Sequence, residues 1–209
     1  MTPQTPPTPL RLVLIDDEKL IRSALATMLD LEDDLEIVAQ ASSAAEGVRI
    51  VTEHTPDVAV VDLQLPDGDG LEICAEIAQH SPGTRCMILT SHARPGYLKR
   101  ALEQGVLGFL PKTTSAPQLA EAVRSVAAGR RAIDPELAAE TISSGNSPLT
   151  PREADVLEYA ADGAGIDQIA RRAHLAEGTV RNYLSNAQAK LQAANRHEAV
   201  AIARRHGWI

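Results

Sequence analysis

Short apolar runs alternate with amphipathic stretches through the first part of the chain. A continuous apolar run is typical of a strand that is buried on both faces of a parallel sheet. The stretches between the runs have helical spacing, as in Ile21, Leu25 and Met28. The runs that we predict as strands are 10–15, 35–39, 58–61, 86–89 and 106–110. This alternation predicts an α/β fold with a five-stranded parallel sheet and helices on both faces.

The last part of the chain has helical spacing throughout. Thr150 to Glu153 form a capping box with a proline in the first helical position, which is a strong signal for a helix start. The helices predicted there are 151–161, 166–173, 177–192 and 196–206. We therefore expect four regions, which are a disordered tail 1–9, an α/β domain 10–130, a linker 131–147 with a short helix, and a small all-α domain 148–209.

Charge is distributed unevenly along the chain. The chain of 209 residues has a formal net charge of −8, whereas residues 165–209 contain seven Lys and Arg against three Asp and Glu. A basic last stretch attached to an acidic remainder restricts any nucleic-acid binding to that stretch. The aromatic content of 2% argues against binding of RNA or single strands, which uses exposed rings for base stacking.

Several other classes of protein are disfavoured. The sequence contains no apolar run long enough to span a membrane, so we expect no membrane insertion. Cys74 and Cys86 lack the spacing of a metal site, and their apolar surroundings indicate buried free thiols in a reducing compartment. These observations predict a cytoplasmic protein.

Polar side chains follow four of the predicted strands. Asp16 and Asp17 follow the first strand and Asp62 follows the third, so in a parallel sheet they meet at the same edge. Crowded carboxylates repel each other unless a cation lies between them, and hard oxygen ligands suit Mg²⁺. Thr90 and Lys112 end two further strands, and their hydroxyl and ammonium groups favour an arriving phosphoryl anion. Taken singly, each residue is explained as well by a buried Lys–Asp pair and a capping threonine.

These residues stand in motifs that resemble the receiver domain of two-component response regulators. The matching motifs are DD at 16–17, D-x-x-L-P-x-G-x-G at 62–70, TS at 90–91 and GFLPK at 108–112. The resemblance covers residues 10–130 and implies a flavodoxin-like fold. It also implies that Asp62 accepts a phosphoryl group from the phosphohistidine of a sensor histidine kinase.

The same resemblance implies roles for the neighbouring residues. The implied Mg²⁺ ligands are Asp16, Asp17, Asp62 and the backbone carbonyl of Gln64. Lys112 would bind the phosphoryl group, while Thr90 and Phe109 would move together as a switch. One departure is that Pro111 precedes Lys112, whereas many receivers have a proline after the lysine. A proline restricts the residue before it to extended geometry, which bears on how Lys112 is positioned.

The all-α part resembles a LuxR-type helix-turn-helix domain. The matching motifs are LTPRE at 149–153, IARR at 169–172 and EGTVRNYLSN at 177–186. Together with the receiver motifs they make the chain resemble a NarL/FixJ-type response regulator, and the runs 31–38, 93–97 and 134–137 are similar to a DesR-like subgroup. The implied DNA-binding residues are Thr179, Arg181, Asn182 and Ser185, with Lys190 as a contact to phosphate.

The resemblance implies a transcription factor that phosphorylation converts to a dimer on promoter DNA. RNA polymerase is a further partner that it allows, and the subgroup suggests membrane-lipid genes as targets. One alternative is a regulator that binds DNA without phosphorylation. Another is an aspartyl-phosphate phosphohydrolase, but such enzymes carry a second acid where this chain has Gln64, so we expect no enzyme. Asp67 and Asp69 either tune metal affinity or merely solvate a turn, and we favour the turn.

Two helix starts in the all-α part lack a capping side chain. Gly165 stands where the family usually has Ser or Thr, and Ala176 stands where it often has Ser. Loss of a serine cap to alanine costs about 1 kcal/mol. We therefore expect this domain to be marginally stable.

Overall fold

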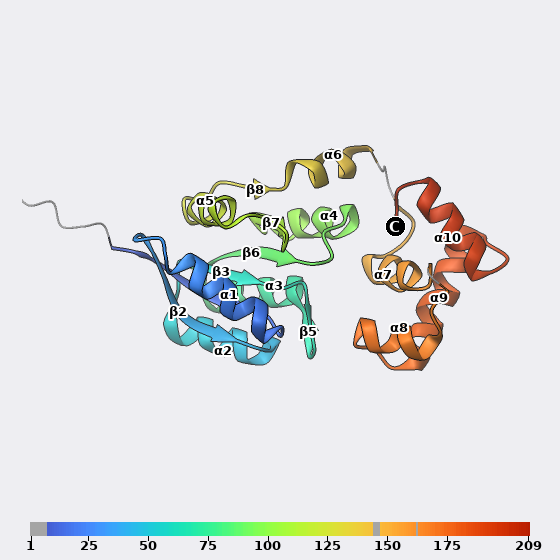
Figure 1. Cartoon of the computed structure of the whole chain (residues 1–209), viewed down its shortest axis with the longest axis horizontal. Helices are drawn as coiled ribbons and strands as arrows, with labels where there is room; N and C mark the ends of the chain where they lie inside the picture. Colours follow the sequence, from blue (N-terminus) through green and yellow to red (C-terminus); the bar gives the residue numbers. More distant parts are fainter. Residues whose placement is uncertain (1–7, 144–146, 162) are drawn as a thin grey trace, which may run out of the picture. The chain divides into compact units, whose positions relative to one another are not determined.

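The computed structural model of the chain describes residues 8–143, 147–161 and 163–209 (Figure 1). Most of the predicted tail 1–9 lies outside the described residues. The chain forms two compact units. The first comprises the residues up to Ala93 together with Arg100–Asp134, and the second comprises Arg94–Lys99 and Pro135–Ile209.

A parallel sheet forms the centre of the first unit (Figure 1). Its strands are β1 (Leu10–Ile15), β2 (Leu35–Ala41), β3 (Val58–Val61), β6 (Arg85–Thr90), β7 (Gly108–Pro111) and β8 (Ala132–Ile133). They are hydrogen-bonded in the order β2-β1-β3-β6-β7-β8, and every pair is parallel. The predicted α/β fold is therefore confirmed.

The sheet has one strand more than the sequence pattern predicts. The prediction of five strands is wrong because Ala132 and Ile133, assigned to the linker, pair with Gly108 and Phe109 of β7. The Ala132 N–H donates to the Leu107 carbonyl at 2.9 Å. A strand of two residues is too short to produce an apolar run, so only the tertiary pairing reveals it.

Helices cover both faces of the sheet. They are α1 (Lys19–Leu29), α2 (Ala44–His54), α3 (Gly70–His80), α4 (Pro95–Glu103) and α5 (Ala116–Ala127). Leu14 of β1 shares a buried cluster with Leu29 of α1 and Val123 of α5. The next residue, Ile15, points to the opposite face, where it meets Gly47 of α2. This alternation along β1 places α1 and α5 on one face and α2 on the other.

A small hairpin follows β3 and anchors the start of α2. The hairpin consists of β4 (Gln64–Leu65) and β5 (Gly68–Asp69). Between its strands, the Asp67 carboxylate accepts hydrogen bonds from the backbone N–H groups of Ala44 and Ala45, at 2.7 and 3.2 Å. The Ala44 amide in particular holds the pKa of Asp67 below its ordinary value. Asp67 therefore caps a helix that is distant in the sequence.

Asp69 connects the same hairpin to two further helices. Its carboxylate caps α3 by accepting the Leu71 N–H at 2.9 Å, and it forms an ion pair with Arg100 of α4 at 2.8 Å. Asp69 is buried, so this pair is shielded from solvent. Asp67 and Asp69 thus do more than the solvation of a turn that the sequence indicates, because they hold helices that lie outside the hairpin.

The second unit contains five labelled helices besides the start of α4. They are α6 (Pro135–Ser143), α7 (Pro151–Tyr159), α8 (Ile166–Ala173), α9 (Glu177–Leu191) and α10 (Arg196–Arg205). The predicted capping box is present, because Thr150 Oγ1 accepts the Glu153 N–H at 3.3 Å and Glu153 accepts the Thr150 N–H at 2.7 Å. Among the described residues, no helix is long and apolar enough to cross a membrane.

Two helix starts of this unit lack a capping side chain, as predicted. Neither Gly165 before α8 nor Ala176 before α9 provides a side-chain hydrogen bond. Gln168 reaches back and accepts the Gly165 N–H at 3.3 Å, which supplies half of a capping box. The low stability expected for this unit stays a prediction.

Gly70 marks the closest backbone approach in the first unit and generates a testable prediction. A Cβ atom there would lie 2.1 Å from the Asp62 carbonyl oxygen, which is backbone and cannot turn aside. We expect Gly70→Ala to lower the free energy of unfolding of this unit by about 1–3 kcal/mol, as overpacking does elsewhere.

The measurement is urea unfolding of the full chain, followed by circular dichroism. Gly83→Ala is the matched control, because a Cβ atom at Gly83 meets nothing within 4 Å. We expect this control to keep the wild-type stability. Equal losses of stability in the two variants would contradict the role of the close approach.

Candidate functional site

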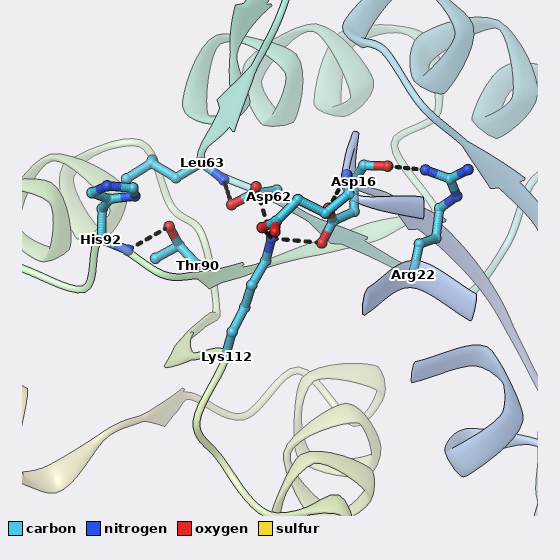
Figure 2. A network of polar contacts seen from close by, with 8 residues as sticks. Asp16, Arg22, Asp62, Leu63, Thr90, His92 and Lys112 are labelled. Atoms are coloured by element: carbon cyan, nitrogen blue, oxygen red, sulfur yellow. Dashed lines mark hydrogen bonds and ion pairs between the residues drawn. The ribbon is translucent and has the colours of Figure 1, made fainter. Parts of the chain in front are cut away.

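The carboxyl ends of four neighbouring strands bring the predicted site residues together. Asp16 follows β1, Asp62 follows β3, Thr90 ends β6 and Lys112 follows β7. These strands are adjacent and parallel in the sheet, so their ends share one edge. Figure 2 shows the Lys112 side chain extending toward Asp62 and Asp16, with Thr90 beside them.

Three carboxylates converge at this edge. Asp16, Asp17 and Asp62 each offer an oxygen atom, and the three atoms lie within 4.8 Å of one another. Asp16 and Asp62 are buried, whereas Asp17 is half-buried. Carboxylate oxygens are the hard ligands that Mg²⁺ prefers. The residues present therefore fit a divalent cation.

Lys112 supplies the positive charge at this site. Its ammonium lies 2.8 Å from Asp16 Oδ2 and 3.0 Å from Asp62 Oδ2, and a further acid, Glu18, lies at 2.9 Å. Burial alone would lower the pKa of Lys112, but the carboxylates of Asp16, Asp62 and Glu18 outweigh it and raise the pKa above its ordinary value. Lys112 is therefore a fixed cation at any physiological pH.

The electrostatics of Asp62 differ from those of an ordinary carboxyl group. Burial raises its pKa to about 6, against the opposing attraction of Lys112. Its Oδ1 accepts the Leu63 N–H at 2.7 Å (Figure 2). A carboxyl group with this pKa is mostly ionised at neutral pH and takes up a proton below about pH 6, and a divalent cation beside it would favour the ionised form.

Thr90 and Phe109, the expected switch residues, are both buried. The Thr90 hydroxyl accepts the backbone N–H of His92 at 3.0 Å. Phe109 lies on β7, where it pairs with Ile88 of β6. Gln64, the expected carbonyl ligand, lies in the hairpin directly after Asp62. Of these residues only Thr90 ends its strand, whereas Phe109 lies inside β7 and Gln64 lies in the hairpin, and the roles of all three stay predictions.

Sequence reasoning missed two residues at the site. Glu18 directly follows the two predicted metal ligands, and its ion pair with Lys112 was not expected. Arg22, one turn later in α1, donates a hydrogen bond to the backbone carbonyl of Asp16 (Figure 2). The continuous acidic run Asp16-Asp17-Glu18 was the only available signal for Glu18, because its partner is distant in the sequence.

The candidate DNA-binding residues lie on α9. Its buried face consists of Val180, Leu184, Ala187 and Leu191, as the sequence pattern predicts. Arg181, Asn182 and Ser185 are exposed, and Thr179 is half-buried at the start of the same helix. Arg181 forms an ion pair with Glu177 at 2.7 Å, and both side chains remain largely exposed. A polar, exposed helix face of this kind can enter a major groove.

Lys190 occupies a different environment. Its ammonium lies 2.7 Å from Glu153 Oε2, and the Glu153 side chain is only 4% exposed. The same carboxylate closes the capping box of α7. Lys190 itself is exposed, so it pairs with a buried carboxylate from the surface, and its contact with phosphate stays a prediction.

Two known protein families each match one part of the chain. Residues 12–124 match the response regulator receiver domain, and residues 147–203 match the bacterial regulatory proteins of the luxR family. The chain is 39% identical to the transcriptional regulatory protein DesR of Bacillus subtilis (strain 168) over 200 residues, which cover 96% of this chain and 99% of that protein. It is 36% identical over 203 residues to the DNA-binding transcriptional activator DevR/DosR of Mycobacterium tuberculosis (strain ATCC 25618 / H37Rv), with coverage of 93% and 94%.

Solved structures agree with these matches. The response regulator ChrA of a heme-sensing two-component system is 31% identical with a TM-score of 0.57, covering 96% of this chain and 99% of that one. RcsB from Salmonella enterica serovar Typhimurium, bound to a promoter, has a TM-score of 0.66 at 20% identity, covers 96% of this chain and 99% of that one, and shows the shared fold.

The raised pKa of Asp62 generates a prediction about stability. Its pKa is about 6 in the folded chain against 3.8 ordinarily, so the folded state binds this proton more tightly than the unfolded state does. The resulting stabilisation is present below pH 4 and is lost as the pH rises through 6. Without Mg²⁺, we expect ionisation of Asp62 to lower the free energy of unfolding by about 1–3 kcal/mol as the pH rises through this range.

The measurement is denaturant unfolding of wild type and Asp62→Asn between pH 4 and pH 7 in EDTA. The stability of wild type relative to the variant should fall as the pH rises, and Mg²⁺ at pH 7 should recover part of the loss. Asp33→Asn removes the same charge from an exposed position and serves as the control. Parallel curves for wild type and Asp62→Asn would contradict the prediction.

Proposed function

The chain belongs to the two-component response regulators that join a receiver domain to a LuxR-type DNA-binding domain, and we propose that phosphorylation of Asp62 controls its binding to promoter DNA. The observation that carries this proposal is the convergence of Asp16, Asp17 and Asp62 on the Lys112 ammonium. The chain is a transcription regulator and not an enzyme, because its relatives are transcriptional regulators with the same two domains.

Asp62 is the proposed nucleophile of the phosphotransfer. One of its carboxylate oxygens attacks the phosphorus atom of a phosphohistidine on a sensor histidine kinase. The new bond makes Asp62 an acyl phosphate, and the P–N bond to the histidine breaks, returning its electron pair to the imidazole. The pKa of about 6 supports this role, because Asp62 is mostly ionised and nucleophilic at neutral pH.

The neighbouring side chains hold the reacting groups. Asp16, Asp17 and Asp62, with the backbone carbonyl of Gln64, would hold Mg²⁺, which supplies charge neutralisation for the phosphoryl oxygens when bound. The Lys112 ammonium would pair with a phosphoryl oxygen, since it already lies 3.0 Å from Asp62 Oδ2.

Thr90 and Phe109 are the proposed switch. The added phosphate brings more negative charge and new acceptor oxygens to the edge of the sheet. The Thr90 hydroxyl would turn toward these oxygens and away from the His92 N–H that it accepts at 3.0 Å. Phe109, on the neighbouring strand, would move with it. The shift would bias α4, which follows Thr90 in the chain.

The proposed output is a dimer on double-stranded promoter DNA. Two copies of a small reading helix are needed for affinity, so paired half-sites are expected. Arg181 could reach guanine or phosphate, Asn182 could recognise adenine, and Thr179 and Ser185 could contact the backbone. The proposal includes a cytoplasmic location and contact with RNA polymerase. Membrane-lipid genes as targets remain part of the proposal.

Phosphorylation is tested with acetyl phosphate and Mg²⁺ on a gel that retards phosphoproteins. Wild type should shift to the slower band and Asp62→Asn should not, because the nucleophile is lost. The exposed control Asp33→Asn should shift as wild type does. Equal labelling of Asp62→Asn would show that the acceptor assignment is wrong. DNA binding without any labelling of wild type would favour the phosphorylation-independent regulator.

The recognition helix is tested by mobility shift with a fragment from upstream of the chain's own gene. Arg181→Ala and Asn182→Ala should each weaken specific binding by roughly 10- to 100-fold, as the loss of one base contact does. Arg49→Ala removes an exposed positive charge from α2 and is the control. Unchanged binding by both α9 variants would contradict the assignment of α9.

A further inference from the structure

We propose that Glu18 is a positioning residue that restrains Lys112 and slows phosphorylation of Asp62. Glu18 lies outside the set of groups that hold Mg²⁺ or phosphate in the proposed function, and the inference rests on that function. Its carboxylate lies 2.9 Å from the Lys112 ammonium, the same ammonium that must receive the incoming phosphoryl oxygen.

The ammonium of Lys112 has no donor to spare. A lysine ammonium has three N–H donors, and Lys112 faces three carboxylates, of Asp16, Asp62 and Glu18, at 2.8, 3.0 and 2.9 Å. A phosphoryl oxygen that binds Lys112 must therefore displace one of the three. The free-energy cost of this replacement depends on which carboxylate is displaced.

Glu18 is the group that is most easily displaced. The side chains of Asp16 and Asp62 are 6% and 8% exposed, whereas that of Glu18 is 51% exposed. A carboxylate that is already half in water regains its hydration when it leaves, but a buried one does not. Asp16 and Asp62 thus remain beside Lys112, and Glu18 gives way.

The backbone holds Glu18 in place while its side chain is free to reach Lys112. The Glu18 N–H donates to Asp16 Oδ1 at 2.8 Å, and its carbonyl accepts the Arg22 N–H at 2.9 Å. Glu18 is the N-cap residue of α1, yet its side chain makes no capping bond. Glutamate is not among the residues that cap well, because caps are made by the shorter Ser, Thr, Asp and Asn.

Removal of the Glu18 carboxylate would release one N–H donor of Lys112 for the incoming phosphoryl oxygen. The structure therefore assigns Glu18 an inhibitory role, in contrast to the neighbouring acids that the reaction needs.

The test measures the initial rate of Asp62 labelling of the full chain over a series of acetyl phosphate concentrations at saturating Mg²⁺. Glu18→Gln should label roughly three- to tenfold faster at low acetyl phosphate, the size of effect expected for coupled neighbours. The faster labelling should appear as a lower half-saturating concentration of acetyl phosphate, because the variant binds the phosphoryl anion more readily. Glu53→Gln removes a charge from an exposed pair on α2 and should match wild type.

Two further variants separate an ion pair from a charge effect. Glu18→Asp keeps the charge but is shorter and caps α1 well, so its carboxylate leaves Lys112 and labelling should be as fast as in Glu18→Gln. In a Lys112→Ala background, Glu18→Gln should give no further gain, since the two residues act through one contact.

The outcomes distinguish this inference from the function on which it rests. If wild type is labelled on Asp62 but Glu18→Gln is no faster, the role of Glu18 is wrong and the phosphorylation site stands. The ion-pair role is also wrong if Glu18→Asp is labelled only as fast as wild type. It is equally wrong if Glu18→Gln still speeds labelling in the Lys112→Ala background. If wild type is not labelled on Asp62, the proposed function itself fails.

Discussion

The arrangement of the receiver depends on mutual repulsion among carboxylates at one edge of its sheet. Asp16, Asp17, Asp62 and Glu18 gather there, and Lys112 is the ammonium that faces three of them. One ammonium cannot balance four acids of which Asp16 and Asp62 are buried, so a further cation would be favoured at this edge and an anion disfavoured before that cation binds. The proposed binding of metal and the proposed restraint on phosphorylation would both follow from this imbalance of charge.

Most of this arrangement could be predicted from local patterns. Apolar runs indicate the strands, and the first polar residue after a run lies at the carboxyl edge, which is why Asp62, Thr90 and Lys112 were found without a structure. The partners of these residues could not be found in the same way. Glu18 meets Lys112 across 94 positions of sequence, and only the order of strands in the sheet brings them together.

The same limit applies to the basic residues of the helical unit. A basic residue on a helix is predicted to face solvent, and Arg181 does so while it pairs with Glu177 one turn away. Lys190 instead meets Glu153, a carboxylate that is buried by the packing of α7 against α9. Sequence spacing shows pairs within a helix, whereas pairs between helices depend on packing that the sequence alone does not show. The strand β8 was missed for the same reason.

The hairpin after Asp62 has a consequence for how the receiver tolerates change in its length. Within a few residues, Asp67 caps α2 while Asp69 caps α3 and binds Arg100 of α4. One short segment of the chain thus positions three helices. An insertion or deletion there would release all three at once, whereas one in an ordinary surface loop would affect only its own ends. Both the length of this segment and the carboxylates of Asp67 and Asp69 are therefore constrained by the helices that they hold.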